Sequence, residues 1–333
     1  MNRASLVFAA LLAVLLPLSL LAGRVWIAPS GADWPQNAAL ILAELRLPRA
    51  VLAVTIGAGL GAAGAAMQGY LRNPLADPGL FGIAPLAALG AVASFWFAPL
   101  LPLAFAAWSL PVMALGGAGL GMASLALIAG RTSNDAADGA GGGIALFTLA
   151  GLMLASLAGA LTALAITLAP NPFALSEIVL WLNGALTDRS WNEVMLAAPL
   201  TAAGIAVLAL AARSLDALTL GEAAARSLGL EPRRLLALLV LGIGLTVGAS
   251  VAVAGIIGFV GLVVPHLVRP LTNRLPSSLI LPSALAGACL VLAADSIVRI
   301  LPLVTELRLG IALSLIGAPF FGWLLLRMRR GRL

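Results

Sequence analysis

The chain has 333 residues, of which 62% are hydrophobic and 10% are charged, and its net charge is +6. With a mean hydropathy of +1.09, it carries more apolar surface than a soluble domain of this length can bury, so lipid is its expected solvent. Long unbroken apolar runs exclude a β-barrel. All basic residues are arginine, which excludes a P-loop ATPase, because the Walker A loop needs a lysine.

The apolar runs predict an all-α polytopic membrane protein with a single transmembrane domain over residues 1–333. A spanning helix needs about 20 apolar residues, and Pro, Gly and charged residues punctuate the chain between such runs. About ten helices are expected, near residues 5–23, 47–70, 79–98, 107–129, 144–169, 191–212, 233–254, 257–269, 279–297 and 308–326. The first run is interpreted as an uncleaved helix rather than a cleaved secretory signal.

Three segments differ from simple spanning helices. Residues 255–272 are rich in Gly and Pro and predict a broken or re-entrant helix. The apolar stretch within residues 171–190 is too short to span the bilayer and predicts a helix on the periplasmic surface. Residues 214–232 form the longest cytoplasmic excursion, with a short helix expected between two glycines.

A faint internal repeat links two of the helices. Pro48-Arg49 and Pro232-Arg233 each open a glycine-rich helix, and in the predicted topology these helices run in opposite directions. That arrangement is expected of an inverted-topology repeat. Small residues at such spacings also arise from close helix packing in lipid, so both interpretations stay open.

The distribution of arginine sets the expected orientation. With a cytoplasmic N-terminus, thirteen arginines face the cytoplasm and six face outward, which matches the positive-inside bias. The basic tail over residues 327–332 places the C-terminus in the cytoplasm too. Six tryptophans fall near the outer boundary as interfacial anchors would: Trp26, Trp34, Trp96, Trp108, Trp181 and Trp191.

Four motifs occur in order along the chain. The first runs from Arg46-Leu-Pro-Arg49 to Gln68 and on to Asn73-Pro-Leu-Ala-Asp77-Pro, where two prolines force a turn at the cytoplasmic boundary. Taken alone, it also fits an ordinary tight turn. The other three are Leu220-Gly-Glu-Ala-Ala-Ala-Arg-Ser-Leu-Gly229, Gly258 to His266 with Arg269, and a closing region with Asp295, Arg299, Glu306-Leu-Arg-Leu-Gly310 and Gly317-Ala-Pro-Phe320.

Together these motifs resemble the FecCD family of importer permeases over essentially the whole chain. The resemblance implies the membrane-spanning permease subunit of a type II ABC importer in the bacterial inner membrane, which carries iron-siderophore, haem or cobalamin-type ligands inward. The implied partners are cytoplasmic ABC ATPase subunits, a periplasmic substrate-binding protein and a second permease, either another copy or a homologue. Neither the ligand nor the choice between homodimer and heterodimer follows from the sequence.

The resemblance also implies roles for particular residues. Arg46, Arg49 and Arg299 match positions that pair with acidic residues of the binding protein, for which the guanidinium fork is suited. The alternative is that they anchor helix ends or pair locally, as the spacing of four residues would allow for Asp295 and Arg299.

The cytoplasmic residues have implied roles as well. Gly221, Glu222, Arg226 and Gly229 match the segment that couples the permease to the ATPase, with Glu222 and Arg226 as exposed contacts. Asn73 and Leu75 match a position that narrows the pathway at its cytoplasmic end. The family's second constriction, a pair of hydroxyl residues, is replaced here by residues 143–145, which leaves the exact gate open.

No catalytic or metal site is expected. His266 is the only histidine and has no Cys or carboxylate neighbours in sequence, so we interpret it as a structural residue that hydrogen-bonds near the broken helix. Cys289 has no partner cysteine and is expected to be a packing residue. No cofactor is expected, and ATP hydrolysis is assigned to another chain.

Two other functions are compatible with a polytopic membrane protein. An ion-gradient-driven secondary transporter usually carries ionisable residues at membrane depth, whereas here Asp77, Glu177, Asp295 and Glu306 lie at predicted boundaries. A scaffold without transport activity is disfavoured by the helices that Gly and Pro interrupt.

Overall fold

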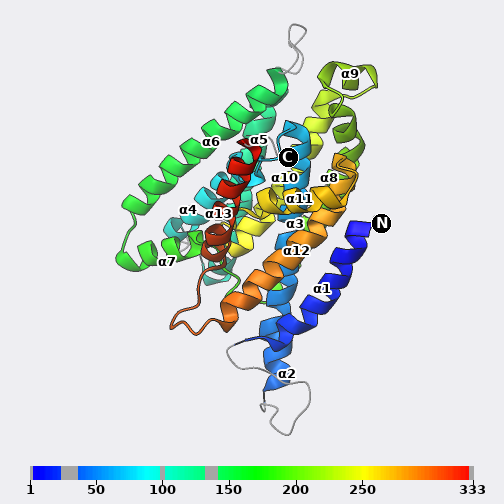
Figure 1. Cartoon of the computed structure of the whole chain (residues 1–333). Coiled ribbons are helices and arrows are strands. Elements are labelled where there is room, and N and C mark those ends of the chain that lie inside the picture. Colours follow the sequence, from blue (N-terminus) through cyan, green and yellow to red (C-terminus); the bar gives the residue numbers. More distant parts are fainter. Residues whose placement is uncertain (1–2, 24–36, 98–101, 132–141, 330–333) are drawn as a thin grey trace.

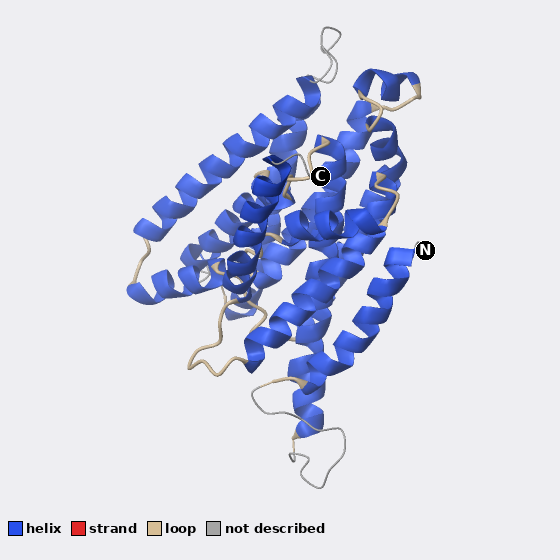
Figure 2. Cartoon of the chain, in the orientation of Figure 1, coloured by secondary structure: helices blue, strands red, loops and turns tan. Residues whose placement is uncertain are grey.

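The computed structural model describes residues 3–23, 37–97, 102–131 and 142–329. Throughout these ranges the ordered elements are helices, without a β-strand (Figures 1 and 2). They are α1 (Arg3–Leu21), α2 (Ala38–Leu40), the π-helical stretch η1 (Ile41–Arg46), α3 (Leu47–Leu71), the 3-10 turn η2 (Pro78–Leu80), α4 (Ile83–Phe97), α5 (Leu103–Arg131), α6 (Gly142–Thr167), α7 (Pro172–Leu182), α8 (Trp191–Leu218), α9 (Glu222–Ser227), α10 (Pro232–Ala254), α11 (Val260–Val268), the 3-10 turn η5 (Arg269–Leu271), α12 (Pro276–Ile300) and α13 (Leu309–Arg329).

Eight of the described helices are long and apolar enough to cross a membrane. They begin with α1 and with the continuous stretch Ala38–Leu71, and they also include α5, α6, α8, α10, α12 and α13. α4 and α11 are apolar but shorter. The prediction of about ten membrane helices is therefore confirmed in outline. Arg24, Trp26, Trp34, Arg330 and Arg332, which entered the predicted orientation, lie outside the described residues.

α3 is the central helix, and glycines let it approach its neighbours closely. A Cβ on Gly57 would lie 2.2 Å from the carbonyl oxygen of Gly287, and a Cβ on Gly61 would lie 2.1 Å from that of Ser283, both on α12. On the same helix, a Cβ on Gly64 would lie 2.0 Å from the carbonyl oxygen of Gly261 in α11. Small residues therefore permit backbone-to-backbone packing, the usual way in which helices associate in lipid.

The predicted break near residues 255–272 is present. α10 ends at Ala254, and α11 begins only at Val260 after an irregular stretch. Gly255 has φ 74° and Phe259 has φ 67°, so the chain leaves the helical region at both ends of the gap. The peptide N–H of Ala185 donates to the carbonyl of Ala254 at 2.8 Å, which satisfies a backbone group that the break would otherwise expose.

α3 and α10 run in opposite directions. Tyr70, one residue before the end of α3, lines the same cavity as Pro232, the first residue of α10. This is the geometry that an inverted repeat requires. The repeat itself stays a prediction.

The segment predicted as a cytoplasmic excursion begins later than the sequence indicates. α8 continues through Arg213 to Leu218, six residues beyond its predicted end, because Leu215 and Leu218 are buried against the other helices. Asp216 accepts a hydrogen bond from the N–H of Ser277 at 2.8 Å, in the first turn of α12. The polar residues in this stretch therefore mark the exit from lipid rather than the end of the helix.

The two ends of the molecule differ in form (Figure 1). α9 lies beside the end of α8 at one end of the bundle, where the short helix stands apart from the long ones. α2, α7 and the loop between α12 and α13 lie at the opposite end. The segment predicted as a surface helix over residues 171–190 contains the helix α7 only up to Leu182, followed by a turn in which Gly184 has φ 65°.

Candidate functional site

Arg49 lies at the centre of a polar cluster at the end of the bundle opposite α9. Its Nε and Nη2 both donate to Asp295 Oδ1, at 3.0 and 2.8 Å. Its Nη1 and Nη2 also donate to the carboxylate of Glu306. The Asp295 side chain is fully buried, whereas that of Glu306 is 22% exposed. One guanidinium therefore bridges a carboxylate of α12 and one of the loop that follows it.

Arg299 completes this cluster from the next turn of α12. Its Nε lies 3.1 Å from Asp295 Oδ2, and its Nη2 donates to Ser19 Oγ on α1 at 2.7 Å. Ion pairs taken out of water are stable only when further hydrogen bonds satisfy the remaining polar atoms. The polar contacts of the two arginines therefore fasten α1, α3 and α12 to one another.

Arg46 is buried nearby with different partners. Its Nη1 donates to the carbonyl oxygens of Leu20 and Leu21, at 2.8 and 2.9 Å. These carbonyls belong to the last turn of α1, where the helix offers no further N–H groups for them to accept from. Arg46 thus caps the C-terminal end of α1.

All three arginines expected to meet a binding protein are thus largely buried and paired within the chain. The local pair of Asp295 and Arg299, the alternative interpretation of the sequence, is present. Four residues form the ion pairs of this cluster: Arg49, Asp295, Arg299 and Glu306. The side chain of Glu306 is the most exposed of the four. Sequence reasoning missed the Arg49 partners, since they lie 246 and 257 residues away along the chain.

The turn after α3 holds the two residues predicted to narrow the pathway. Arg72 ends the helix with φ 49°, and Asn73 then folds back so that its Oδ1 accepts from the N–H of Leu75 at 2.9 Å. This is an Asx turn, which fixes the loop by a side-chain to backbone bond. Asn73 is exposed and Leu75 is half-buried.

Leu75 lines an apolar cavity of about 360 Å³ beside the broken helix. Its walls come from α3, α4 and α10, from the irregular stretch before α11, and from Phe321 on α13. Asp77 lies at its edge and accepts a hydrogen bond from the N–H of Gly79 at 2.8 Å. Burial raises the pKa of Asp77, and backbone hydrogen bonds from Gly79 and Phe259 oppose that shift.

Gln68 is a buried polar residue that joins α3 to α11. Its Nε2 donates to the carbonyls of Gly261 and Leu262, at 3.3 and 3.1 Å, and its Oε1 accepts from Arg269 Nη2 at 2.9 Å. A glutamine on an apolar helix needs such partners, because an unpaired buried amide is costly. The sequence placed Gln68 in a motif without showing that it contacts both ends of α11.

α9 lies between two glycines, each of which has a positive φ angle that favours glycine. Gly221 has φ 98° and Gly229 has φ 87°, and for each a side chain would meet open space, so backbone conformation rather than crowding favours glycine there. Ala225 is fully buried, while Leu220 and Leu228 are 66% and 67% exposed. Exposed apolar side chains therefore flank the short helix, one before it and one after it.

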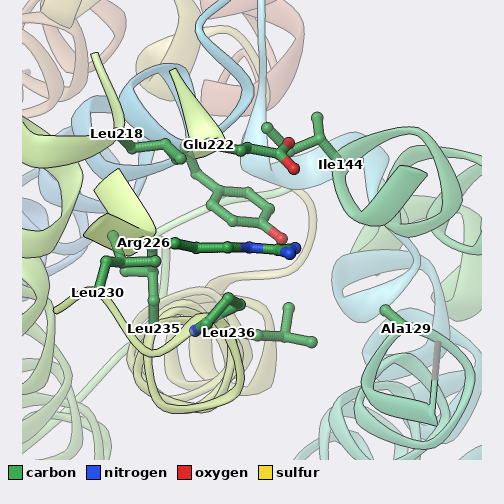
Figure 3. Close-up of a pocket in the computed structure, with 10 residues that line it drawn as sticks. Ala129, Ile144, Leu218, Glu222, Arg226, Leu230, Leu235 and Leu236 are labelled. Atoms are coloured by element: carbon green, nitrogen blue, oxygen red, sulfur yellow. The ribbon is translucent and has the colours of Figure 1, made fainter. Parts of the chain in front are cut away.

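Glu222 and Arg226 do not both face outward as expected. Both line a small cavity of about 50 Å³ with Tyr70 of α3, and Figure 3 shows their side chains directed into this space, close to Leu218 and Ile144. Glu222 is half-buried, whereas Arg226 keeps exposed surface. α9 thus touches the end of α3 that leads into the turn at Asn73.

The two residues weighed as metal ligands have packing roles. The His266 ring lies edge-on to Phe320 with centroids 6.1 Å apart, and its buried Nδ1 has no hydrogen-bond partner among the described residues, so the hydrogen bond expected there is not seen. Cys289 is buried with its Sγ 3.5 Å from the carbonyl of Phe8.

The spanning helices, the interrupted helix beside an apolar cavity and the short helix exposed at one end define a multi-pass membrane permease. The FecCD transport family model matches residues 11–327. The chain belongs to the FecCD transport family and is a permease of the ABC transporter type.

Curated relatives support this assignment. The chain is 38% identical to the hemin transport system permease protein HmuU of Yersinia pestis, over 87% of this chain and 84% of that protein. It is 39% identical to the vitamin B12 import system permease protein BtuC of Vibrio cholerae, over 93% and 89%. It is 36% identical to the Fe(3+) dicitrate transport system permease protein FecD of Escherichia coli, over 87% and 86%.

A solved structure has the same fold. It is an inward-facing conformation of an ABC transporter of the metal-chelate type, with a TM-score of 0.84 and 28% sequence identity. The match covers 97% of this chain and 98% of the other.

Proposed function

We propose that this permease carries an iron chelate, haem or a cobalamin-type ligand inward across the bacterial inner membrane. The observation that carries the proposal is the family match over nearly the whole chain, together with relatives named for hemin, vitamin B12 and iron citrate. The partners are cytoplasmic ATPase subunits, a periplasmic binding protein and a second permease. Both termini lie in the cytoplasm.

The ATPase is proposed to dock on α9 through its outward face. Leu220 and Leu228, which flank α9, are exposed and apolar, and exposed apolar side chains grouped on a surface are typical of an interface. Gly221 and Gly229 set the limits of the helix, and Glu222 and Arg226 connect it inward to Tyr70. Movement of the ATPase would thereby reach the end of α3.

The cytoplasmic gate is proposed to include Asn73 and Leu75. The Asx turn gives this loop a defined shape, and Leu75 contributes to the wall of the apolar cavity. Because Tyr70 precedes this loop by only three residues, a shift of α9 against Tyr70 is expected to move the loop. In the proposed dimer, the two copies of this loop narrow a shared pathway.

The binding protein is proposed to dock at the opposite end, over the cluster of Arg46, Arg49 and Arg299. Since these guanidiniums have partners within the chain, a carboxylate of the binding protein would compete with Glu306 for Arg49. An exchange of one carboxylate for another keeps Arg49 paired throughout, which avoids the cost of a bare buried charge.

Reconstitution tests the transport function. The permease is inserted into proteoliposomes with the ATPase and binding protein that its gene neighbourhood supplies, and uptake of radiolabelled haem, cobalamin and ferric siderophore is measured. We expect uptake of one ligand class that requires ATP and both partners. Uptake driven by a proton or sodium gradient without the ATPase would overturn the proposal.

A further inference from the structure

A third cavity, of about 220 Å³, lies at the same end of the bundle as α9. It lies where α3 and α8 end and α12 begins, and its lining includes Gln68, Arg72, Thr219, Arg269 and Arg274. Three of the described lining residues are arginines, and none of the described ones is acidic. We call it the arginine pocket. Neither the gate nor the contact of α9 with Tyr70 uses it.

The charges of the arginine pocket are not neutralised by the described part of the chain. No described carboxylate lies within 4.0 Å of Arg72, Arg269 or Arg274. The nearby Asp216 already accepts from the N–H of Ser277 at the start of α12. Arg274 acts on Arg269 as a like charge. Such a set of cations is less unfavourable when an anion lies between them.

Arg269 is positioned for a ligand rather than left to move in solvent. Gln68, which is only 2% exposed, accepts from Arg269 Nη2 at 2.9 Å and is itself held by two carbonyls of α11. The Nε of Arg269 is buried and has no hydrogen-bond partner among the described residues. The contact with Gln68 fixes the guanidinium of Arg269 at the wall of the pocket, where its positive charge favours an oxyanion.

The size of the pocket and its surroundings indicate which anion fits. Its volume is below the about 300 Å³ at which sites for drug-sized ligands begin, so a single phosphate group fits better than a nucleotide. Leu271 and Leu275, next to the arginines in sequence, are 56% and 40% exposed. Basic pockets between helices at the cytoplasmic boundary, beside exposed apolar side chains, are typical phospholipid headgroup sites.

We propose that the arginine pocket binds the phosphate of an anionic phospholipid from the inner leaflet. The guanidiniums of Arg72, Arg269 and Arg274 hold the phosphate, and Leu271 and Leu275 lie beside the acyl chains. Free phosphate offers the same group to the same donors, so the test separates these two sources. Bound lipid would join the ends of α3 and α8 to the start of α12.

The test uses native mass spectrometry of the full chain purified in detergent, which is titrated separately with phosphatidylglycerol, phosphatidylcholine, inorganic phosphate and the ATPase subunit. The variant is the double substitution Arg72→Gln and Arg274→Gln, which leaves the Gln68 contact intact. Its matched control is Arg233→Gln with Arg234→Gln, two exposed arginines at the start of α10 that do not line the pocket. The control removes the same charge from the same end.

We expect the parent and the control to bind phosphatidylglycerol more tightly than phosphatidylcholine, and the pocket variant to bind it about thirtyfold more weakly. Equal loss in both double variants would overturn the proposal, since the effect would then be net charge alone. If inorganic phosphate binds and the two lipids bind equally well, the phosphate in the pocket does not come from an anionic lipid, and the proposal is overturned. If neither phosphate nor lipid binds and the pocket variant instead loses the ATPase subunit, the pocket is a protein contact and the proposal fails.

Discussion

The two polar clusters of this permease use arginine in opposite ways. At the end opposite α9, Arg49 and Arg299 share the buried Asp295 and are held by Glu306 and Ser19. At the end near α9, three arginines line a pocket without any described acidic partner. The first cluster joins helices, whereas the second leaves charges available to something outside the chain. The same residue type is thus paired with carboxylates within the chain at one end and has no described acidic partner at the other.

The largest expected effect comes from breaking the closed cluster. Asp295→Ala leaves two buried guanidiniums without their shared carboxylate, and the loss of one partner of a buried ion pair costs about 3–5 kcal/mol. Thermal unfolding of the purified variant in detergent measures the loss. Asp216→Ala, which removes a single hydrogen bond to Ser277, is the milder control. Equal stability of the Asp295 variant and the parent would show that the cluster does not join the helices.

The next effect tests the close packing of α3. Gly61→Ala places a methyl group 2.1 Å from the carbonyl oxygen of Ser283, so α12 must move away, at a cost of about 1–3 kcal/mol. Gly119→Ala on α5 is the matched control, because a Cβ there meets nothing within 4 Å. We expect loss of unfolding free energy only for Gly61→Ala. A similar stability of both variants would contradict the packing described here.

Gln68 allows the two ends of α11 to be weakened by a change at one uncharged residue, which contacts Arg269 of the arginine pocket but neither Arg49 nor Arg299. Gln68→Leu removes two donated hydrogen bonds and one accepted from Arg269. The expected loss of unfolding free energy is about 1–3 kcal/mol, because buried groups are left unpaired. Gln68→Met, with its more flexible side chain, is expected to lose the same hydrogen bonds and show a similar loss. Wild-type stability in both variants would mean that packing alone holds α11.

The sequence was sufficient to predict where the helices lie but not which distant side chains meet. Helix positions were predicted because lipid imposes length and apolarity on each span, so residues 47–70 and 233–254 nearly match α3 and α10. The direction of a side chain is decided by contacts between distant segments. Arg49 meets Asp295 across 246 residues, and local sequence could not reveal that pairing.

Two further differences have the same physical origin. Glu222 was expected to be exposed, yet α9 docks with Ala225 buried and turns Glu222 into the cavity beside Tyr70. α8 was expected to end near residue 212, yet it continues to Leu218 because Leu215 packs against the bundle. Polarity marks where lipid ends, but tertiary packing decides where a helix ends.

The smallest expected effect on stability is at the exposed edge of the closed cluster. Glu306→Gln is expected to cost less than about 1 kcal/mol, because the side chain is 22% exposed and Asp295 still pairs with Arg49. If the binding protein competes with Glu306 for Arg49, this variant should bind it more tightly, with an effect that shrinks at high salt. Glu44→Gln, an exposed charge change at the same end, is the control. Weaker binding in Glu306→Gln alone would contradict the competition.

Site-directed labelling tests most directly whether the two ends serve opposite sides of the membrane. Leu228→Cys lies directly after α9, where the residue is 67% exposed, and Val304→Cys lies in the loop after α12, where the residue is 97% exposed. Each is made with Cys289→Ser, and intact spheroplasts and inverted vesicles are treated with an impermeant maleimide. We predict that the Leu228→Cys variant reacts only in inverted vesicles, and only when the ATPase has been removed from them. We predict that the Val304→Cys variant reacts only in spheroplasts. Reaction of both from one side, or the reverse pattern, would contradict the assignment of α9 to the ATPase.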